Sequence, residues 1–124
     1  MYNFQGDFSQ EEKSLFQKIQ LENLDKICHY LQVNLNNSPQ IKYYVFNTRQ
    51  GKIDADPNHS VSKAVARYNE NAIYRFWDKI EDPSFPHELT HLIAHHFSTP
   101  YRLHTEVDQA NGEKLIIDID MVST

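Results

Sequence analysis

Apolar residues recur at spacings of three to five along the first third of the chain. The recurring positions are Phe16, Ile19, Leu24, Ile27, Cys28, Leu31 and Leu35. Because residues three and four apart share one face of a helix, this spacing predicts an amphipathic helix over about residues 10–34. Ser9 and Glu12 fit a capping box at its start. The run Asn-Asn-Ser-Pro at residues 36–39 is expected to end it.

The middle of the chain changes to β-branched and aromatic residues, which favour strands. Residues 41–47 (IKYYVFN) predict a buried strand, and residues 52–55 predict a short second strand after a glycine turn. Residues 61–68 and 72–77 flank an Asn-Glu-Asn loop and predict a hairpin, although the same residues could form one helix. The aromatic residues on both sides of the loop favour the hairpin.

A second helix is expected over about residues 85–97, with Ser84 as the N-cap and Pro86 in the first turn. Beyond it, residues 103–107 and 114–121 predict strands joined around an Asn-Gly turn. The order of helix, strands, helix and strands predicts an α+β fold.

Length and composition suit one domain spanning residues 1–124. Hydrophobic residues make up 40% of the chain and aromatic residues 12%, too many for a disordered chain. The formal net charge of −5 argues against nucleic-acid or anionic-membrane partners. Without a signal-peptide pattern or a long apolar run, we expect a cytoplasmic protein. The single cysteine, Cys28, leaves His, Asp and Glu as the side chains for any metal site.

The second predicted helix carries the chain's most informative motif. Residues 87–91 read His-Glu-Leu-Thr-His, the H-E-x-x-H pattern. His87 and His91 lie one helical turn apart on one face, so both imidazoles can reach one zinc ion at about 2.0–2.1 Å. Glu88 is turned away by about 100°. Its carboxylate is therefore predicted to act as a general base on a water activated by the metal.

The faces of this helix support the same interpretation. At about 100° per residue, His91 and His95 lie near 40° and 80° from His87. The apolar residues lie at about 140–280°, on the other side: Leu89, Leu92, Ile93 and Phe97. His95 lies about 12 Å along the axis from His87, too far to share one metal with it. We expect His96, on the apolar side, to be packed or capping, and His29 and His59, elsewhere in the chain, to be exposed.

The motif resembles that of the zincin metallopeptidases, in their gluzincin-like branch. The resemblance rests on HELTH at residues 87–91, preceded by the strand-like NAIYRFW at residues 71–77. It implies zinc as the cofactor, His87 and His91 as ligands and Glu88 as the general base. It also implies a mixed sheet packed on the N-terminal helix and the motif helix, with an edge strand that holds an extended peptide.

The resemblance also implies a third zinc ligand. The metzincin extension fails, because Ala94 replaces its glycine and Phe97 its third histidine. Gluzincins take a glutamate from downstream, and Glu106 is the first choice here. The ligand could instead lie beyond Thr124, if this chain is the N-terminal part of a longer peptidase domain. The downstream candidates are His104, Glu106, Asp108, Glu113, Asp118 and Asp120.

These features predict a zinc-dependent metallopeptidase that hydrolyses peptide bonds in a peptide or protein substrate. Tyr101 and His104 are candidates for stabilising the oxyanion. One alternative is a catalytically inactive zincin-fold module that binds a protein partner. Another is a plain α+β domain in which the histidine helix is incidental. The oligomeric state stays open.

Overall fold

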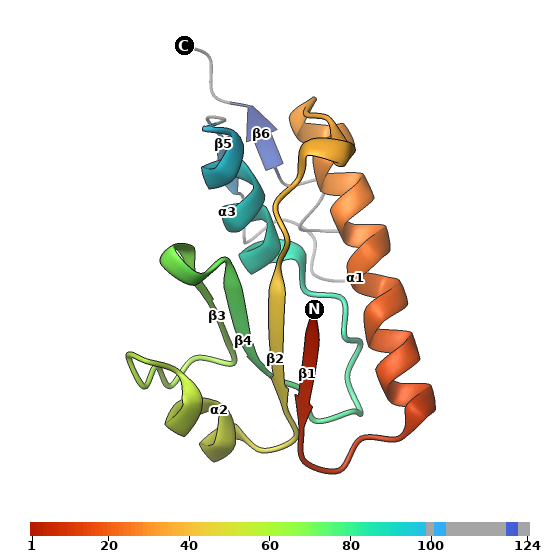
Figure 1. Cartoon of the computed structure of the whole chain (residues 1–124), viewed down its shortest axis with the longest axis vertical. Coiled ribbons are helices and arrows are strands. Elements are labelled where there is room, and N and C mark those ends of the chain that lie inside the picture. Colours follow the sequence, from red (N-terminus) through yellow and green to blue (C-terminus); the bar gives the residue numbers. More distant parts are fainter. Residues whose placement is uncertain (99–100, 104–118, 122–124) are drawn as a thin grey trace.

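A four-stranded mixed sheet forms the centre of the structure, a computed structural model that describes residues 1–98, 101–103 and 119–121 (Figure 1). The α+β fold class is confirmed. The elements follow one another as β1 (Tyr2–Gln5), α1 (Gln10–Leu31), η1 (Leu35–Asn37), β2 (Lys42–Phe46), α2 (Arg49–Ala55), β3 (Ala64–Arg67), η2 (Tyr68–Glu70), β4 (Ala72–Phe76), α3 (Pro86–Phe97), β5 (Tyr101–Leu103) and β6 (Ile119–Met121).

The strands lie in the order β1-β2-β4-β3. The first three are parallel, with Tyr43 of β2 opposite both Tyr2 of β1 and Ile73 of β4. β3 forms one edge and runs antiparallel to β4, with Ala66 opposite Ile73. The predicted hairpin of residues 61–77 is therefore confirmed, and the short 3-10 helix η2 forms its connection.

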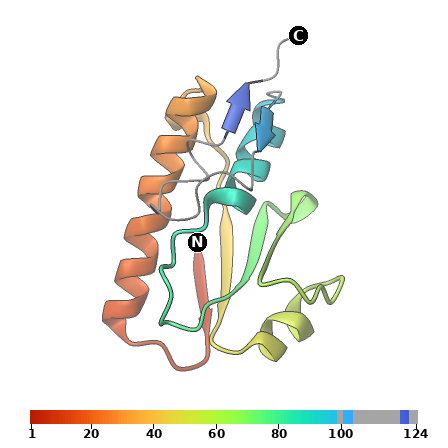
Figure 2. The same ribbon diagram turned by 180° about the vertical axis from the view of Figure 1, so that it is seen from behind.

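Helices cover both faces of this sheet (Figures 1 and 2). Strand residues alternate between the faces, as period-two geometry requires. Tyr43 and Val45 of β2 face the core shared with α1 and α3. Phe46 belongs to a smaller cluster on the other face, where α2 packs against β2 and β4. The largest fully buried side chains of the main core are Phe16, Ile27, Leu31, Leu89, Leu92, Ile93 and Trp77.

The N-terminal helix begins as the sequence predicts. The Ser9 hydroxyl accepts from the Glu12 N–H at 3.1 Å, and the Ser9 N–H donates to the Glu12 carboxylate at 2.7 Å, completing the capping box. The helix ends at Leu31, three residues before the predicted end. Gln32 takes the left-handed conformation there (φ 59°), and its N–H caps the last carbonyls.

Two predictions in the first half of the chain are wrong or incomplete. β1 was not predicted, although Tyr2 and Phe4 alternate with more exposed neighbours. Residues 52–55 belong to the helix α2, not to a strand. Its N-cap is Thr48, whose hydroxyl accepts from the Gly51 N–H at 3.1 Å. A Cβ on Gly51 would lie 2.9 Å from that hydroxyl, so this glycine serves a helix start instead of a turn.

The motif helix forms over residues 86–97, as predicted, with Pro86 in its first turn. The predicted cap is wrong: the N-cap is Phe85, without a side-chain hydrogen bond. The Ser84 hydroxyl donates instead to the Asn23 side-chain oxygen at 3.4 Å. Of the predicted final hairpin, the structure describes the antiparallel pair β5 and β6. The Asn-Gly turn between them lies outside the described residues.

Candidate metal centre

Helix α3 presents two chemically different faces, as its sequence predicts. Leu89 and Ile93 are fully buried and Leu92 is 1% exposed, all within the main core. His87 and His91 are half-buried on another face. Because the apolar face is fixed against α1 and the sheet, the orientation of the histidine face is fixed as well.

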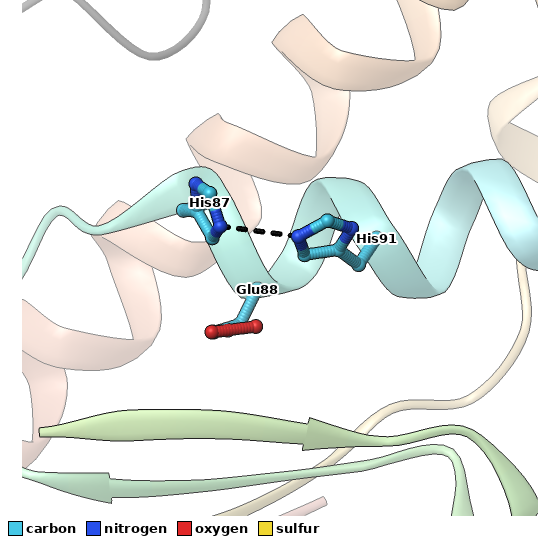
Figure 3. A group of neighbouring side chains, drawn as sticks. All are labelled: His87, Glu88 and His91. Carbon is cyan, nitrogen blue, oxygen red and sulfur yellow. Dashed lines mark hydrogen bonds between the residues drawn. The ribbon is translucent and has the colours of Figure 1, made fainter. Parts of the chain in front are cut away.

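His87 and His91 lie with their rings side by side (Figure 3). Their Nε2 atoms are 3.1 Å apart. Two tetrahedral ligands with zinc–nitrogen bonds of 2.0–2.1 Å are about 3.3 Å from each other. The pair therefore has nearly the separation that one shared zinc ion requires. The same distance suits an N–H···N hydrogen bond between two neutral rings.

Glu88 points away from the histidine pair, toward β3 (Figure 3). Its carboxylate accepts a hydrogen bond from the backbone N–H of Ala66 on that strand. The candidate ligand atoms of His87, Glu88 and His91 nevertheless all lie within 4.8 Å of one another. The carboxylate is thus held at the edge of the sheet, within reach of a small ligand that contacts both imidazoles.

Burial sets the charge state of this group. Burial raises the pKa of Glu88 to about 6. The Ala66 N–H and the positive charges of Lys52 and Arg67 lower this pKa, but by less than burial raises it. Such a carboxylate is ionised at neutral pH and is a stronger base than an exposed one. Burial lowers the pKa of His87, and burial and then the charge of His87 lower that of His91. Neutral imidazole is the form that binds metal ions.

Hydrogen bonds fix the loop before α3. The Pro83 carbonyl accepts from the Gln20 side chain of α1 and from Arg75 of β4, both at 3.0 Å. The Arg75 guanidinium lies 5.3 Å from the centre of the Phe85 ring, which lies 6.2 Å from the His87 ring. The start of α3, and His87 with it, is therefore attached to both the long helix and the sheet.

A buried ionic cluster holds the edge strand beside the site. Asp56, at the end of α2, is fully buried and accepts two hydrogen bonds from Arg67 of β3, at 2.7 and 2.6 Å. The Ser60 N–H donates to the same carboxylate at 2.8 Å. Lys52, also fully buried, lies 3.9 Å from Asp56. This cluster joins α2 to Arg67 at the end of β3, the residue next to Ala66.

The other histidines that the structure describes lie apart from this group, in part as predicted. His29 and His59 are exposed, as expected. His95 is exposed, and its ring centre lies 4.6 Å from that of Tyr68. His96 was expected on the apolar side, but it is exposed and its ring N–H donates to the Asn37 carbonyl at 3.1 Å.

Several candidates from the sequence cannot be compared with the structure. Glu106, the predicted third ligand, and His104 lie outside the described residues, as does the side chain of Tyr101. The sequence reasoning did not single out Ala66, Lys52, Arg67 or Tyr68. Three of them, Ala66, Arg67 and Tyr68, belong to the predicted hairpin, whose strand β3 packs beside the motif helix.

Comparisons with protein-family models, curated protein sequences and solved structures gave no match for this chain. Within the part of the chain that the structure describes, no helix has both the length and the apolar character needed to cross a membrane. The chemistry of the site therefore has to be argued from its own residues.

Proposed function

We propose that this chain is a zincin-type metallopeptidase domain that hydrolyses peptide bonds, with zinc as its metal. The observation that carries the proposal is the geometry of His87, Glu88 and His91: two imidazole nitrogens 3.1 Å apart beside a carboxylate bound to the edge strand. Imidazole ligands suit zinc, although they also suit other transition metals. Glu106 remains the predicted third ligand.

A bound divalent metal would supply a coordinated water of lowered pKa and would polarise the substrate carbonyl. Within the chain, His87 and His91 would hold the metal. Glu88 would accept the proton from the attacking water at a carboxylate oxygen and then deliver it to the nitrogen of the leaving amine. Its hydrogen bond from the Ala66 N–H would keep the carboxylate oriented during both transfers.

The surroundings also support a peptide substrate. β3 is an edge strand and lies beside the motif helix. The outer edge of such a strand can pair with an extended chain, which would bring a peptide bond close to Glu88. Two helices on one face of a mixed sheet, one of them carrying the motif, agree with the arrangement that the resemblance to zincins implies.

The deciding experiment compares Glu88→Gln with the parent protein after reconstitution with zinc. We expect cleavage of a mixed peptide library, followed by mass spectrometry, to fall by at least about 100-fold. Zinc content by elemental analysis should stay the same, because the imidazoles are intact. Glu22→Gln, an exposed position on α1, is the matched control. Equal cleavage by Glu88→Gln would disprove the catalytic role of this carboxylate.

A parent protein that binds zinc but cleaves no peptide would favour the inactive, partner-binding alternative. A parent that binds neither zinc nor cobalt nor nickel would favour an incidental histidine helix.

A further inference from the structure

Tyr68 occupies a fixed position beside the candidate site. It directly follows β3 and begins η2. The preceding residue, Arg67, is held by its paired hydrogen bonds to the buried Asp56. Ala66, one residue earlier, donates to Glu88. The backbone that carries Tyr68 is therefore anchored on both the ionic cluster and the motif helix.

The ring of Tyr68 lies against the histidine face of α3. Its centre is 4.6 Å from that of His95, with the two planes inclined by 40°. His95 is one helical turn beyond His91 on the same face, because the two residues are four apart. The tyrosine therefore borders the site at the end of the edge strand.

The hydroxyl of Tyr68 differs from that of Tyr74 in its hydrogen bonding. Among the described residues, it makes no hydrogen bond, while that of Tyr74 donates to Glu70 at 2.8 Å. Tyr68 is 44% exposed, so the residue is accessible from solvent. Burial, and then the negative charge of Glu88, raise the pKa of Tyr68. The phenol therefore keeps its proton at neutral pH and can donate.

We propose that Tyr68 is a further catalytic residue, whose hydroxyl donates a hydrogen bond to the carbonyl oxygen of the peptide bond under attack. This inference rests on the proposed function. No proton is transferred from Tyr68: the hydrogen bond stabilises the negative charge that develops on that oxygen and then relaxes when the carbonyl re-forms. Tyr101 and His104 were the candidates for this role in the sequence.

The test is Tyr68→Phe in the full chain, which removes the hydroxyl and keeps the ring against His95. Loss of one such donor typically lowers kcat by about 100-fold or more. We expect that fall with KM within about twofold of the parent, a pattern typical of an interaction made in the transition state. Zinc content and melting temperature should be unchanged. Tyr44→Phe, on the α2 side of the sheet, is the matched control and should behave as the parent does.

A second readout does not need turnover. Acetohydroxamic acid binding to cobalt-loaded protein, followed by its visible spectrum, should weaken about tenfold in Tyr68→Phe, because one hydrogen bond to a charged ligand is lost. Unchanged kcat together with unchanged hydroxamate affinity would overturn the proposal.

The two proposals can fail separately. If the parent binds metal but cleaves nothing, the proposed peptidase function fails and the hydroxamate comparison alone decides: weakened binding supports the contact by Tyr68, and equal binding overturns it. If the parent takes up no metal, both proposals are overturned.

Discussion

Glu88 accepts a hydrogen bond from the backbone N–H of Ala66, and this bond joins the motif helix to the edge of the sheet. It orients a half-buried carboxylate that the helix alone would leave free to rotate. Because the donor is a backbone group of an edge strand, the same edge can position both the carboxylate and an extended ligand.

The histidine pair gives the first prediction. We expect His91→Ala to lower zinc affinity by more than about 100-fold. Loss of a residue that only supports a metal ligand typically lowers the affinity by about 10- to 100-fold. His95→Ala is the control, because His95 lies outside the candidate group and should leave metal uptake unchanged. Competition with a chromogenic chelator measures both affinities. Similar losses in the two variants would show that the metal does not bind between His87 and His91.

The buried ionic cluster gives a prediction about stability. Asp56→Asn removes a buried charge that Arg67 and Lys52 both face, so it should lower the free energy of unfolding by about 3 kcal/mol. Urea unfolding followed by tryptophan fluorescence measures this loss. Asp54→Asn, two residues earlier and exposed, is the control. A loss below about 1 kcal/mol, the usual effect of an exposed pair, would contradict the importance of the cluster.

The same carboxylate predicts how stability depends on pH. Burial raises the pKa of Asp56, but hydrogen bonds from Arg67, Ser60 and Asn58 outweigh it and lower the pKa from 3.8 to about 2. A lowered pKa in the folded state stabilises the protein above pH 3.8 and ceases to do so as the pH falls through about 2. We expect a loss of about 2 kcal/mol over this window, at 1.36 kcal/mol per pKa unit.

Urea titrations at a series of pH values measure that dependence. Asp56→Asn should show a shallower loss in the same window, because the titrating group is gone. An equally steep loss in the variant would assign the acid sensitivity to other carboxylates.

The end of α1 offers a stabilising substitution. Gln32 has φ 59°, a conformation that costs a side-chain-bearing residue about 1 kcal/mol relative to glycine. Gln32→Gly should therefore raise the free energy of unfolding by about 0.5–1 kcal/mol. Gln17→Gly, within the same helix, should lower it by about 1 kcal/mol. Thermal unfolding checks both, and destabilisation by Gln32→Gly would mean that the side chain makes a compensating contact.

The local sequence pattern predicted the motif helix correctly, because the features that define it are spacings between residues about one helical turn apart. The spacing of His87 and His91, and the apolar face of Leu89 and Ile93, follow from helical geometry alone. The bond between Glu88 and Ala66 could not be predicted, because it joins a side chain to a distant backbone group that any residue would offer.

The elements that were predicted wrongly can also be explained by specific contacts. Gly51 favours a turn by propensity, but it lies in the first turn of α2, where a Cβ would force the Thr48 hydroxyl to shift. Ser84 has a good capping side chain, yet Asn23 of α1 engages its hydroxyl. A capping contact decided the first outcome, and a contact with another helix decided the second. The third metal ligand, Glu106, stays a prediction.

The pairing of β1 with β2 has a consequence for folding during synthesis. Tyr2 lies opposite Tyr43, so the first strand cannot pair until about forty further residues have been made. At roughly 5–20 residues per second, translation leaves Tyr2 and Phe4 without their sheet partner for about 2–8 s. α1 is complete only after Leu31 has been made, so it can shield these aromatic rings from other chains only late in that interval. Growth temperature and translation speed should therefore influence the yield of soluble protein more than they would for a chain whose first strands form a hairpin.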